Sequence, residues 1–170
     1  MSPSFRARLL VAAPSLLDPN FVRTVVLILE HNDEGALGVV LNRPSDIAVG
    51  AALPGWGLLA AEPSVVFLGG PVSPTGAICL GRSASEAGGE DRHPLFHGLG
   101  TVDLDGSPDD VAAAVIDLRV FAGHDGWGPE QREGEVDANA WFVVDAVPGD
   151  AVSAQPERLW ESVLRRQGGA

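Results

Sequence analysis

The sequence predicts a mixed α/β or α+β domain with a β-hairpin at its centre. Three apolar runs, at residues 9–13, 24–29 and 36–41, are short, rich in Val, Leu and Ile, and bounded by Pro, Gly, Asn and Asp, which is typical of strands. Between the last two runs, His31 to Gly35 has the length and the glycine of a hairpin loop with one residue at positive φ. Later helix-type patterns supply the α part of the prediction.

The apolar residues of these runs occupy consecutive positions instead of alternating with polar ones. That pattern predicts strands covered on both faces. The hairpin is therefore expected to lie inside the core, with residues 9–13 beside it. The polar triplet Asn42-Arg43-Pro44 follows the third run directly.

Composition places the chain among globular proteins. Its 170 residues match the size of one domain, and a single domain over residues 1–170 is expected. Hydrophobic content is 45% and charged content 20%. The net charge of −12 repels phosphate backbones and disfavours direct nucleic-acid binding. The single cysteine, Cys79, excludes an internal disulfide and a multi-cysteine zinc site.

The N-terminal apolar run, about six residues, is short for a signal peptide, and no run approaches the roughly 20 residues of a membrane span. The sequence therefore predicts a cytoplasmic protein without a membrane partner.

Beyond the hairpin, turn and cap residues divide the chain into short elements. Ser45 or Asp46 is expected to cap a helix over residues 47–53, which Pro54-Gly55 would end, while residues 56–61 are ambiguous between helix and loop. Further strands are expected at residues 65–68, 76–80, 99–104, 115–121 and 141–144. Loops or irregular segments are expected at residues 81–91, 93–98 and 123–128.

Three helices are expected in the second half of the chain. Ser107-Pro108-Asp109-Asp110 combines an N-cap residue, a proline for the first turn and acidic side chains at the positive end of the dipole, which predicts a helix over residues 108–114. Pro129 is expected to start a helix over residues 130–137. Residues 156–166 form an amphipathic pattern, with Leu159 and Val163 on its apolar side.

None of the catalytic patterns is complete. His93 and His97 have the spacing of two ligands on a helix, but loop signals flank them and the glutamate of a metalloprotease motif is missing. His124-Asp125 offers an acid/base pair without a nucleophile, and Cys79 lies in an apolar run typical of a buried thiol. No catalytic residue, metal site or cofactor is assigned.

The polar triplet is the more informative feature. An arginine at a strand end presents a rigid fork for a carboxylate or phosphate, so Arg43 is a candidate anion ligand. The structural alternative is an internal ion pair with Asp18, Asp46 or Glu135. Trp127, between two glycines, either lines a binding surface or plugs a core edge.

The same motifs carry a family resemblance. They are Asp18-Pro19-Asn20-Phe21, Arg23-Thr24-Val25, His31, Gly35-Ala36, Gly38, Leu41-Asn42-Arg43-Pro44, Gly69-Gly70-Pro71-Val72, Gly126-Trp127-Gly128, Gln131, Glu133, Glu135, Trp141 and Leu159-Trp160. In this order they resemble the YqgE/AlgH family of bacterial proteins over nearly the whole chain. The sequence departs from the family pattern at His124-Asp125.

The resemblance implies an α/β (α+β) domain with a bifurcated, barrel-like mixed β-sheet flanked by short helices. It also implies a cytosolic protein without a known cofactor. The family is largely uncharacterised, and some members carry the name of a transcriptional regulator. The resemblance supplies no catalytic residues.

The leading hypothesis is a non-catalytic binding or regulatory protein with a polar pocket or surface at strand ends. Its partner would be a small molecule or a protein. The residues expected to form this site are Asp18, Asn20, Arg23, Asn42, Arg43, Gly69, Gly70, Pro71, Gly126, Trp127 and Gln131. Two alternatives stay open: an enzyme acting on a small anionic substrate with His31 or His124 as general base, and a transcriptional regulator acting through a protein partner.

Overall fold

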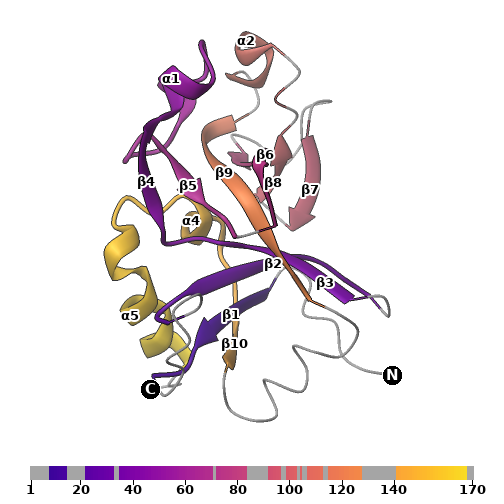
Figure 1. Cartoon of the computed structure of the whole chain (residues 1–170), viewed down its shortest axis with the longest axis vertical. Coiled ribbons are helices and arrows are strands. Elements are labelled where there is room, and N and C mark those ends of the chain that lie inside the picture. Colours follow the sequence, from indigo (N-terminus) through magenta and orange to yellow (C-terminus); the bar gives the residue numbers. More distant parts are fainter. Residues whose placement is uncertain are drawn as a thin grey trace.

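The computed structural model describes residues 8–14, 22–32, 35–70, 72–83, 92–96, 99–102, 104, 107–112, 115–127 and 141–167 (Figure 1). The strands are β1 Arg8–Ala12, β2 Val25–Asn32, β3 Gly35–Val40, β4 Pro44–Ala48, β5 Val65–Leu68, β6 Val72–Ser83, β7 Arg92–Phe96, β8 Leu99–Val102, β9 Val115–Trp127 and β10 Trp141–Asp145. The helices are α1 Val49–Ala52, α2 Pro108–Ala112, α4 Pro148–Ala151 and α5 Pro156–Gln167, with a 3-10 turn, η1, at Gly57–Leu59.

Strand β9 connects two parts of one sheet. The strand order is β10-β1-β2-β3-β9-β6-β8-β7, with β4 and β5 branching from β9. Only the end of β9 pairs with β3, whereas β6 pairs with most of its length and β5 lies parallel to its middle. The expected bifurcated mixed sheet flanked by short helices is therefore confirmed. Among the described strands the path ends at β10 and β7, so the sheet is open and not a closed barrel.

The expected central hairpin is also confirmed. β2 and β3 are antiparallel, and β1 lies beside β2. Gly35 has the predicted positive φ, at 136°. The expected loop is too long, however, because His31 and Asn32 continue β2 and pair with Ala36 and Gly35.

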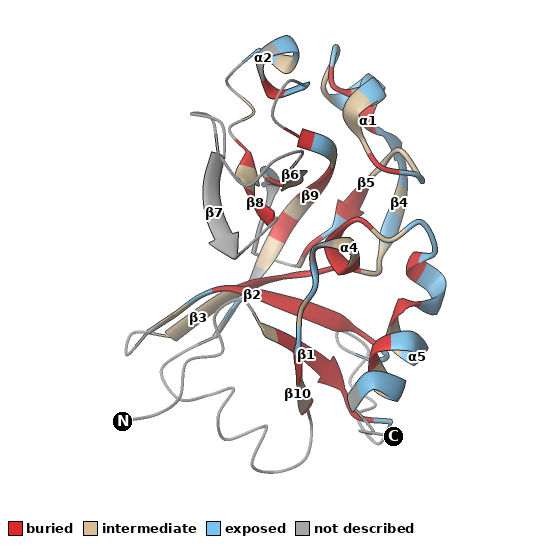
Figure 2. Ribbon diagram, turned by 180° about the vertical axis from the view of Figure 1, so that it is seen from behind, coloured by how far each residue is buried: buried red, intermediate tan, exposed pale blue. Residues whose placement is uncertain are grey.

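Residues 25–29 of β2 and 38–40 of β3 are buried, as their apolar runs predict, whereas residues 35–37 of β3 are half-buried (Figure 2). On one face, Leu9, Val11 and Val144 pack against Leu159 and Val163 of α5, which confirms the amphipathic helix. The other face of β1 and β2 carries a second cluster that contains Leu10, Ala12, Val26, Ile28, Val40 and Trp141. A third cluster lies between β9, β6 and the α1 region.

Several expected loops, and the first two residues of one expected helix, are strands. The helix expected from residue 47 begins only at Val49, since residues 44–48 pair with β5 as β4. Ser45 accepts a hydrogen bond from the Ile47 N–H at 3.1 Å and caps no helix. Residues 92–96 form β7, residues 81–83 extend β6, and residues 123–127 extend β9. In each case pairing with a neighbouring strand overrides local Gly and Pro content.

Other parts of the prediction lie outside the described residues, namely the loop over 84–91 and the helix over 130–137. The expected strands at residues 65–68 and 141–144 and the helix start at Pro108 are confirmed, and the strand expected at 99–104 is confirmed over residues 99–102, since Leu104 lies in a turn. No helix in the described part of the chain is long and apolar enough to cross a bilayer.

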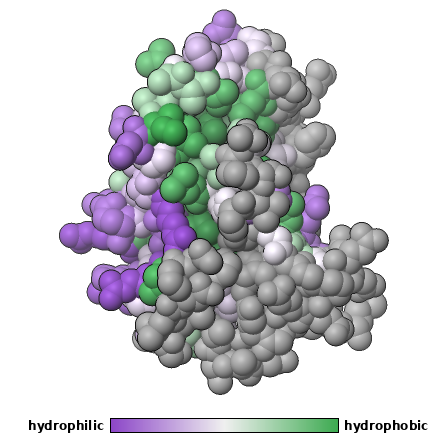
Figure 3. Space-filling model, in the orientation of Figure 1, coloured by the Kyte–Doolittle hydropathy of each residue, from purple (hydrophilic) through white to green (hydrophobic). Residues whose placement is uncertain are grey.

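In Figure 3 apolar residues gather on the upper half of the molecule, where β4, β5 and β9 lie. Large apolar side chains that stay exposed on these strands are Ile47, Leu68 and Ile116.

Candidate functional site

Three strands end together at one corner of the sheet. The last residues of β1, the residues before β2 and the residues after β3 meet there, because Ala12 N donates to Thr24 O at 3.0 Å and Leu41 N donates to Val25 O at 2.8 Å. Arg23, Asn42 and Arg43 occupy this end. We call them, with Gly69 and Gly70, the strand-end corner.

Asn42 holds the corner together. Its Oδ1 accepts a hydrogen bond from Val25 N at 3.1 Å, and its Nδ2 donates to Arg23 O at 2.9 Å. The side chain therefore continues the β2–β3 ladder past the last backbone pair and satisfies one donor and one acceptor. Asn42 is thus part of the architecture that positions its two arginine neighbours.

We expect Asn42→Ala to lower the free energy of unfolding by about 1–2 kcal/mol, because two hydrogen bonds to backbone groups are lost. Asn42→Asp keeps the acceptor for Val25 N but loses the donor to Arg23, so a smaller loss is expected. Urea denaturation of both variants measures this order. Equal stability of Asn42→Ala and wild type would show that water replaces the two hydrogen bonds of the Asn42 side chain.

Arg23 is held in an uncommon conformation. Its φ of 54° lies in the left-handed region, and no other described non-glycine residue has a positive φ. Its side chain is exposed, and its guanidinium carbon lies 5.6 Å from the centre of the Trp160 ring, within the range of a cation–π contact. Trp160 is itself fixed, since its Nε1 donates to Ala12 O at 2.8 Å.

Gly69, directly after β5, connects the end of β3 with β9. Its N–H donates to Ala122 O at 2.9 Å, and its carbonyl accepts from Val40 N at 3.0 Å. A Cβ on Gly69 would meet the carbonyl oxygen of Gly123 closer than real Cβ atoms approach. Gly70 has a φ of 152°, so both glycines occupy positions that other residues fill poorly.

Arg43 lies directly beside this junction. Its carbonyl accepts a hydrogen bond from Leu68 N at 2.8 Å, and its side chain is half-buried. The structure therefore brings together Arg23, Asn42, Arg43, Gly69 and Gly70.

Gly126 and Trp127 lie elsewhere. They pair with Leu37 and Ala36 at the opposite end of β3, which is about 20 Å along an extended strand from Arg43. The structure does not bring them to the strand-end corner. Asp18, Asn20, Pro71 and Gln131 lie outside the described residues, so the structure does not place them.

The two candidate general bases also differ in position. His31 pairs with Ala36 near the tip of the hairpin, far from the corner. His124 follows Gly123 on β9 and pairs with Val72. Cys79 is buried, and burial raises the pKa of its thiol to about 12, so it behaves as an inert apolar residue. No group of three potential metal ligands occurs among the described residues.

Sequence reasoning missed a buried arginine. Arg119 lies on β9 and is only 1% exposed. Its Nη1 donates to Ser153 O at 2.7 Å and its Nη2 to Glu62 O at 2.8 Å, while the guanidinium carbon lies 4.2 Å from the Phe67 ring centre. Burial lowers the pKa of Arg119 to about 10, partly offset by Asp117, so it is charged at neutral pH.

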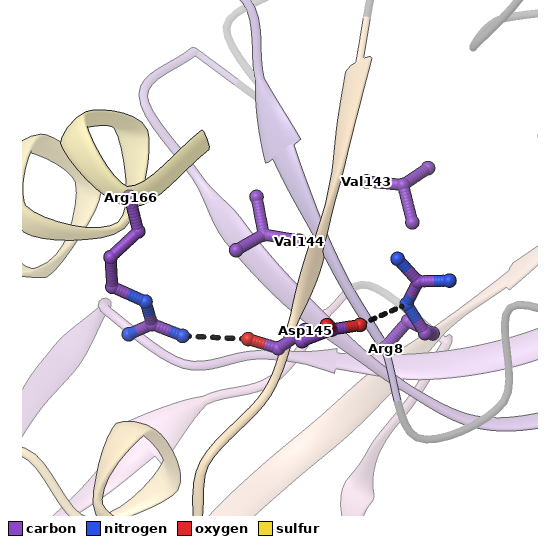
Figure 4. A pocket seen from close by; sticks show the side chains of 5 residues that line it. All are labelled: Arg8, Val143, Val144, Asp145 and Arg166. Carbon is purple, nitrogen blue, oxygen red and sulfur yellow. Dashed lines mark hydrogen bonds and ion pairs between the residues drawn. The ribbon is translucent and has the colours of Figure 1, made fainter. Parts of the chain in front are cut away.

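A second polar group was also missed (Figure 4). Arg166 donates to both carboxylate oxygens of the buried Asp150, at 2.8 and 3.0 Å, and to Asp145 O at 2.7 Å. On the other side of Asp145, Arg8 Nε lies 3.0 Å from its Oδ1. Arg8, Asp145, Arg166 and the two valines before Asp145 line an open pocket of about 310 Å³. No short-range sequence pattern links these positions.

Comparison with known proteins gives relatives that match almost the full chain. A UPF0301 protein of Streptomyces coelicolor is 54% identical over 98% of this chain and 88% of its own length. A UPF0301 protein of Mycobacteroides abscessus is 46% identical over 97% of this chain and 82% of its own length.

Two solved structures share the fold. A crystal structure of a Corynebacterium diphtheriae protein has a TM-score of 0.91 and 32% identity, covering 98% of this chain and 88% of that one. The solution structure of AlgH from Pseudomonas aeruginosa has a TM-score of 0.72 and 27% identity, covering 100% of this chain and 92% of that one. The AlgH-like family, DUF179, matches residues 9–170. This chain therefore belongs to the AlgH-like family of bacterial UPF0301 proteins, whose function is not established.

Proposed function

We propose that this protein is a non-catalytic binding protein whose strand-end corner holds an anionic group of a small molecule or of a partner protein. Arg23 and Arg43 would supply the positive charge, and Trp160 the apolar wall. The conformation of Arg23 carries this proposal. A left-handed non-glycine residue costs free energy, and such strain collects at functional sites.

The surroundings of Arg23 support a binding role. Asn42 holds its backbone and Trp160 lies against its guanidinium, so an exposed cation is kept in one place before any ligand arrives. A preorganised charge loses little conformational entropy on binding. Arg43 follows Asn42 at the same end of the β2–β3 ladder. The forked guanidinium groups of Arg23 and Arg43 both suit a carboxylate or phosphate.

The experiment is a titration of the ¹⁵N-labelled protein with inorganic phosphate and with citrate. The backbone amides of Arg23, Asn42, Arg43 and Gly70 are expected to shift together. Arg23→Gln and Arg43→Gln should each weaken binding by about tenfold, the effect of losing one charge-assisted contact. Arg158→Gln is the matched control, since Arg158 is exposed on α5 away from the corner.

Native mass spectrometry after exposure to cell extract then tests for a natural ligand, with Arg43→Gln alongside. An adduct that the variant loses would support the proposal. Equal anion affinity in all variants, or shifts confined to other residues, would contradict it and leave the corner as architecture.

A further inference from the structure

Arg119 is a buried cation whose hydrogen bonds and ring contact go to segments that lead to the strand-end corner. It lies on β9 and is 1% exposed, so it does not reach the solvent from which a ligand would arrive. Its Nη2 donates to Glu62 O shortly before β5, and its guanidinium lies against the ring of Phe67 within β5. Its Nη1 donates to Ser153 O shortly before α5. The guanidinium thus joins β9 to β5 and to the start of α5.

The contact with Phe67 leads to Arg43 in one step along β5. Phe67 pairs with Pro44 of β4. The next residue of β5, Leu68, donates its N–H to Arg43 O at 2.8 Å. A displacement of β5 relative to β9 would therefore move the backbone of Arg43 as well.

The bond to Ser153 leads to Arg23 through α5. Ser153 Oγ accepts a hydrogen bond from Gln155 N at 3.2 Å, and α5 begins at the next residue. Trp160 lies on this helix, and its ring centre is 5.6 Å from the guanidinium carbon of Arg23. Arg119 therefore holds both of the elements, β5 and α5, that position the two arginines of the corner.

A guanidinium at this place fixes direction as well as stability. No described carboxylate forms a hydrogen bond or ion pair with Arg119, because Asp117 on the same strand is bound by Arg82 at 2.9 and 3.1 Å. The desolvation of the buried charge must therefore be offset by backbone carbonyls. A planar fork reaches two separate carbonyls at fixed angles, which a flexible ammonium group does not do.

We propose that Arg119 is a positioning residue of the strand-end corner. It holds β5 and α5 so that Arg43 and Arg23 lie at the spacing that one anionic group requires. This inference rests on the proposed function, because Arg119 acts on an anion only through these two arginines. The affinity of the corner for an anion then depends on a residue that the anion does not touch.

The test is a double-mutant cycle that combines Arg119→Lys with Arg43→Gln and uses citrate as the probe. Lysine keeps the positive charge but offers one ammonium group in place of the fork. Citrate is titrated into each ¹⁵N-labelled protein at constant ionic strength, and its affinity is read from the amide shifts of Asn42 and Gly70. Every variant is measured at a temperature at which its unfolding curve shows it to be folded.

Arg119→Lys is expected to weaken citrate binding about fivefold when Arg43 is present. In the Arg43→Gln background the same substitution should weaken binding by less than about twofold, because the spacing between two arginines has no effect once one is missing. A role confined to stability would not produce this dependence on the background.

Two further variants complete the test. Arg82→Gln removes the bidentate ion pair with Asp117, which joins β6 to β9 and involves neither β5 nor α5. This matched control should bind citrate as the wild type does. If Arg119→Lys does not fold, Phe67→Leu carries the test, since it removes the ring beside the guanidinium and keeps an apolar side chain in the core. The same loss, present only with Arg43, is expected.

The outcomes separate this inference from the proposed function. If citrate shifts no amide of the corner in the wild-type protein, the proposed function is wrong and this inference fails with it. If Arg43→Gln weakens binding but Arg119→Lys does not, only the positioning role of Arg119 is overturned. Equal weakening by Arg119→Lys in both backgrounds would also overturn it, because the effect would then not pass through the pair of arginines.

Discussion

Arg119→Met is expected to lower the free energy of unfolding by about 3–5 kcal/mol, the largest effect of a single substitution that we predict. Methionine approximately keeps the volume and the contact with Phe67, so the loss isolates the hydrogen bonds. The carbonyls of Ser153 and Glu62 would lose their guanidinium donors inside the protein. Urea denaturation at neutral pH measures the change.

Two further substitutions serve as comparisons for Arg119→Met. Arg119→Lys keeps a charge but offers a shorter, single ammonium group, so an intermediate loss is expected. Arg158→Met, on the exposed face of α5, should change the free energy of unfolding by no more than about 0.5 kcal/mol. If Arg119→Met were as stable as wild type, water or rearranged backbone would be donating to the carbonyls of Ser153 and Glu62. The hydrogen bonds of Arg119 would then not be needed for stability.

Gly69→Ala is expected to cost about 2–4 kcal/mol. The new methyl group would meet Gly123 O closer than real Cβ atoms approach, and Phe121 Cβ at 3.1 Å, which is tighter than most Cβ contacts. Relief requires β5 to move away from β9, which strains the Gly69 bonds to Ala122 and Val40. Thermal and urea unfolding measure the loss, and amide exchange of Val40 and Gly69 should rise locally.

Gly126→Ala is the matched control, because Gly126 lies on β9 where this strand pairs with β3. A Cβ there meets no atom within 4 Å, so the substitution should be neutral or should stabilise by about 0.5 kcal/mol through reduced chain entropy. A similar loss in both variants would point to a general effect of strand glycines. A loss confined to Gly69 would tie it to the junction of β3, β5 and β9.

Local patterns predicted the hairpin because its signals agree with each other. Residues 25–29 and 36–41 are apolar, and Gly35 between them has the positive φ that its loop position requires. Strand β4 was missed because Pro44 and Asp46 argue against a strand. Only its pairing with β5, more than a dozen residues later, shows why the segment is extended.

The candidate site was predicted in part for the same reason. Asn42 and Arg43 stand out because they follow an apolar strand directly, and the structure places Arg23 beside them. Gly126 and Trp127 were expected there because glycines suggested a loop, whereas β9 continues through them to the far end of β3. No local sequence pattern indicated the hydrogen bonds of Arg119, since their acceptors are backbone carbonyls of distant segments.

The pairing of β1 with β10 bears on the order in which the chain folds. Arg8 meets Asp145, 137 residues later, so the first strand of the sheet gains its outer neighbour only when nearly the whole chain is available. Contacts between such distant segments delay folding, because loop closure costs entropy before the pairing repays it. A nascent chain that has emerged only through β3 would therefore display the buried strand Leu9–Ala12 as an apolar edge, the state in which it is most exposed to aggregation.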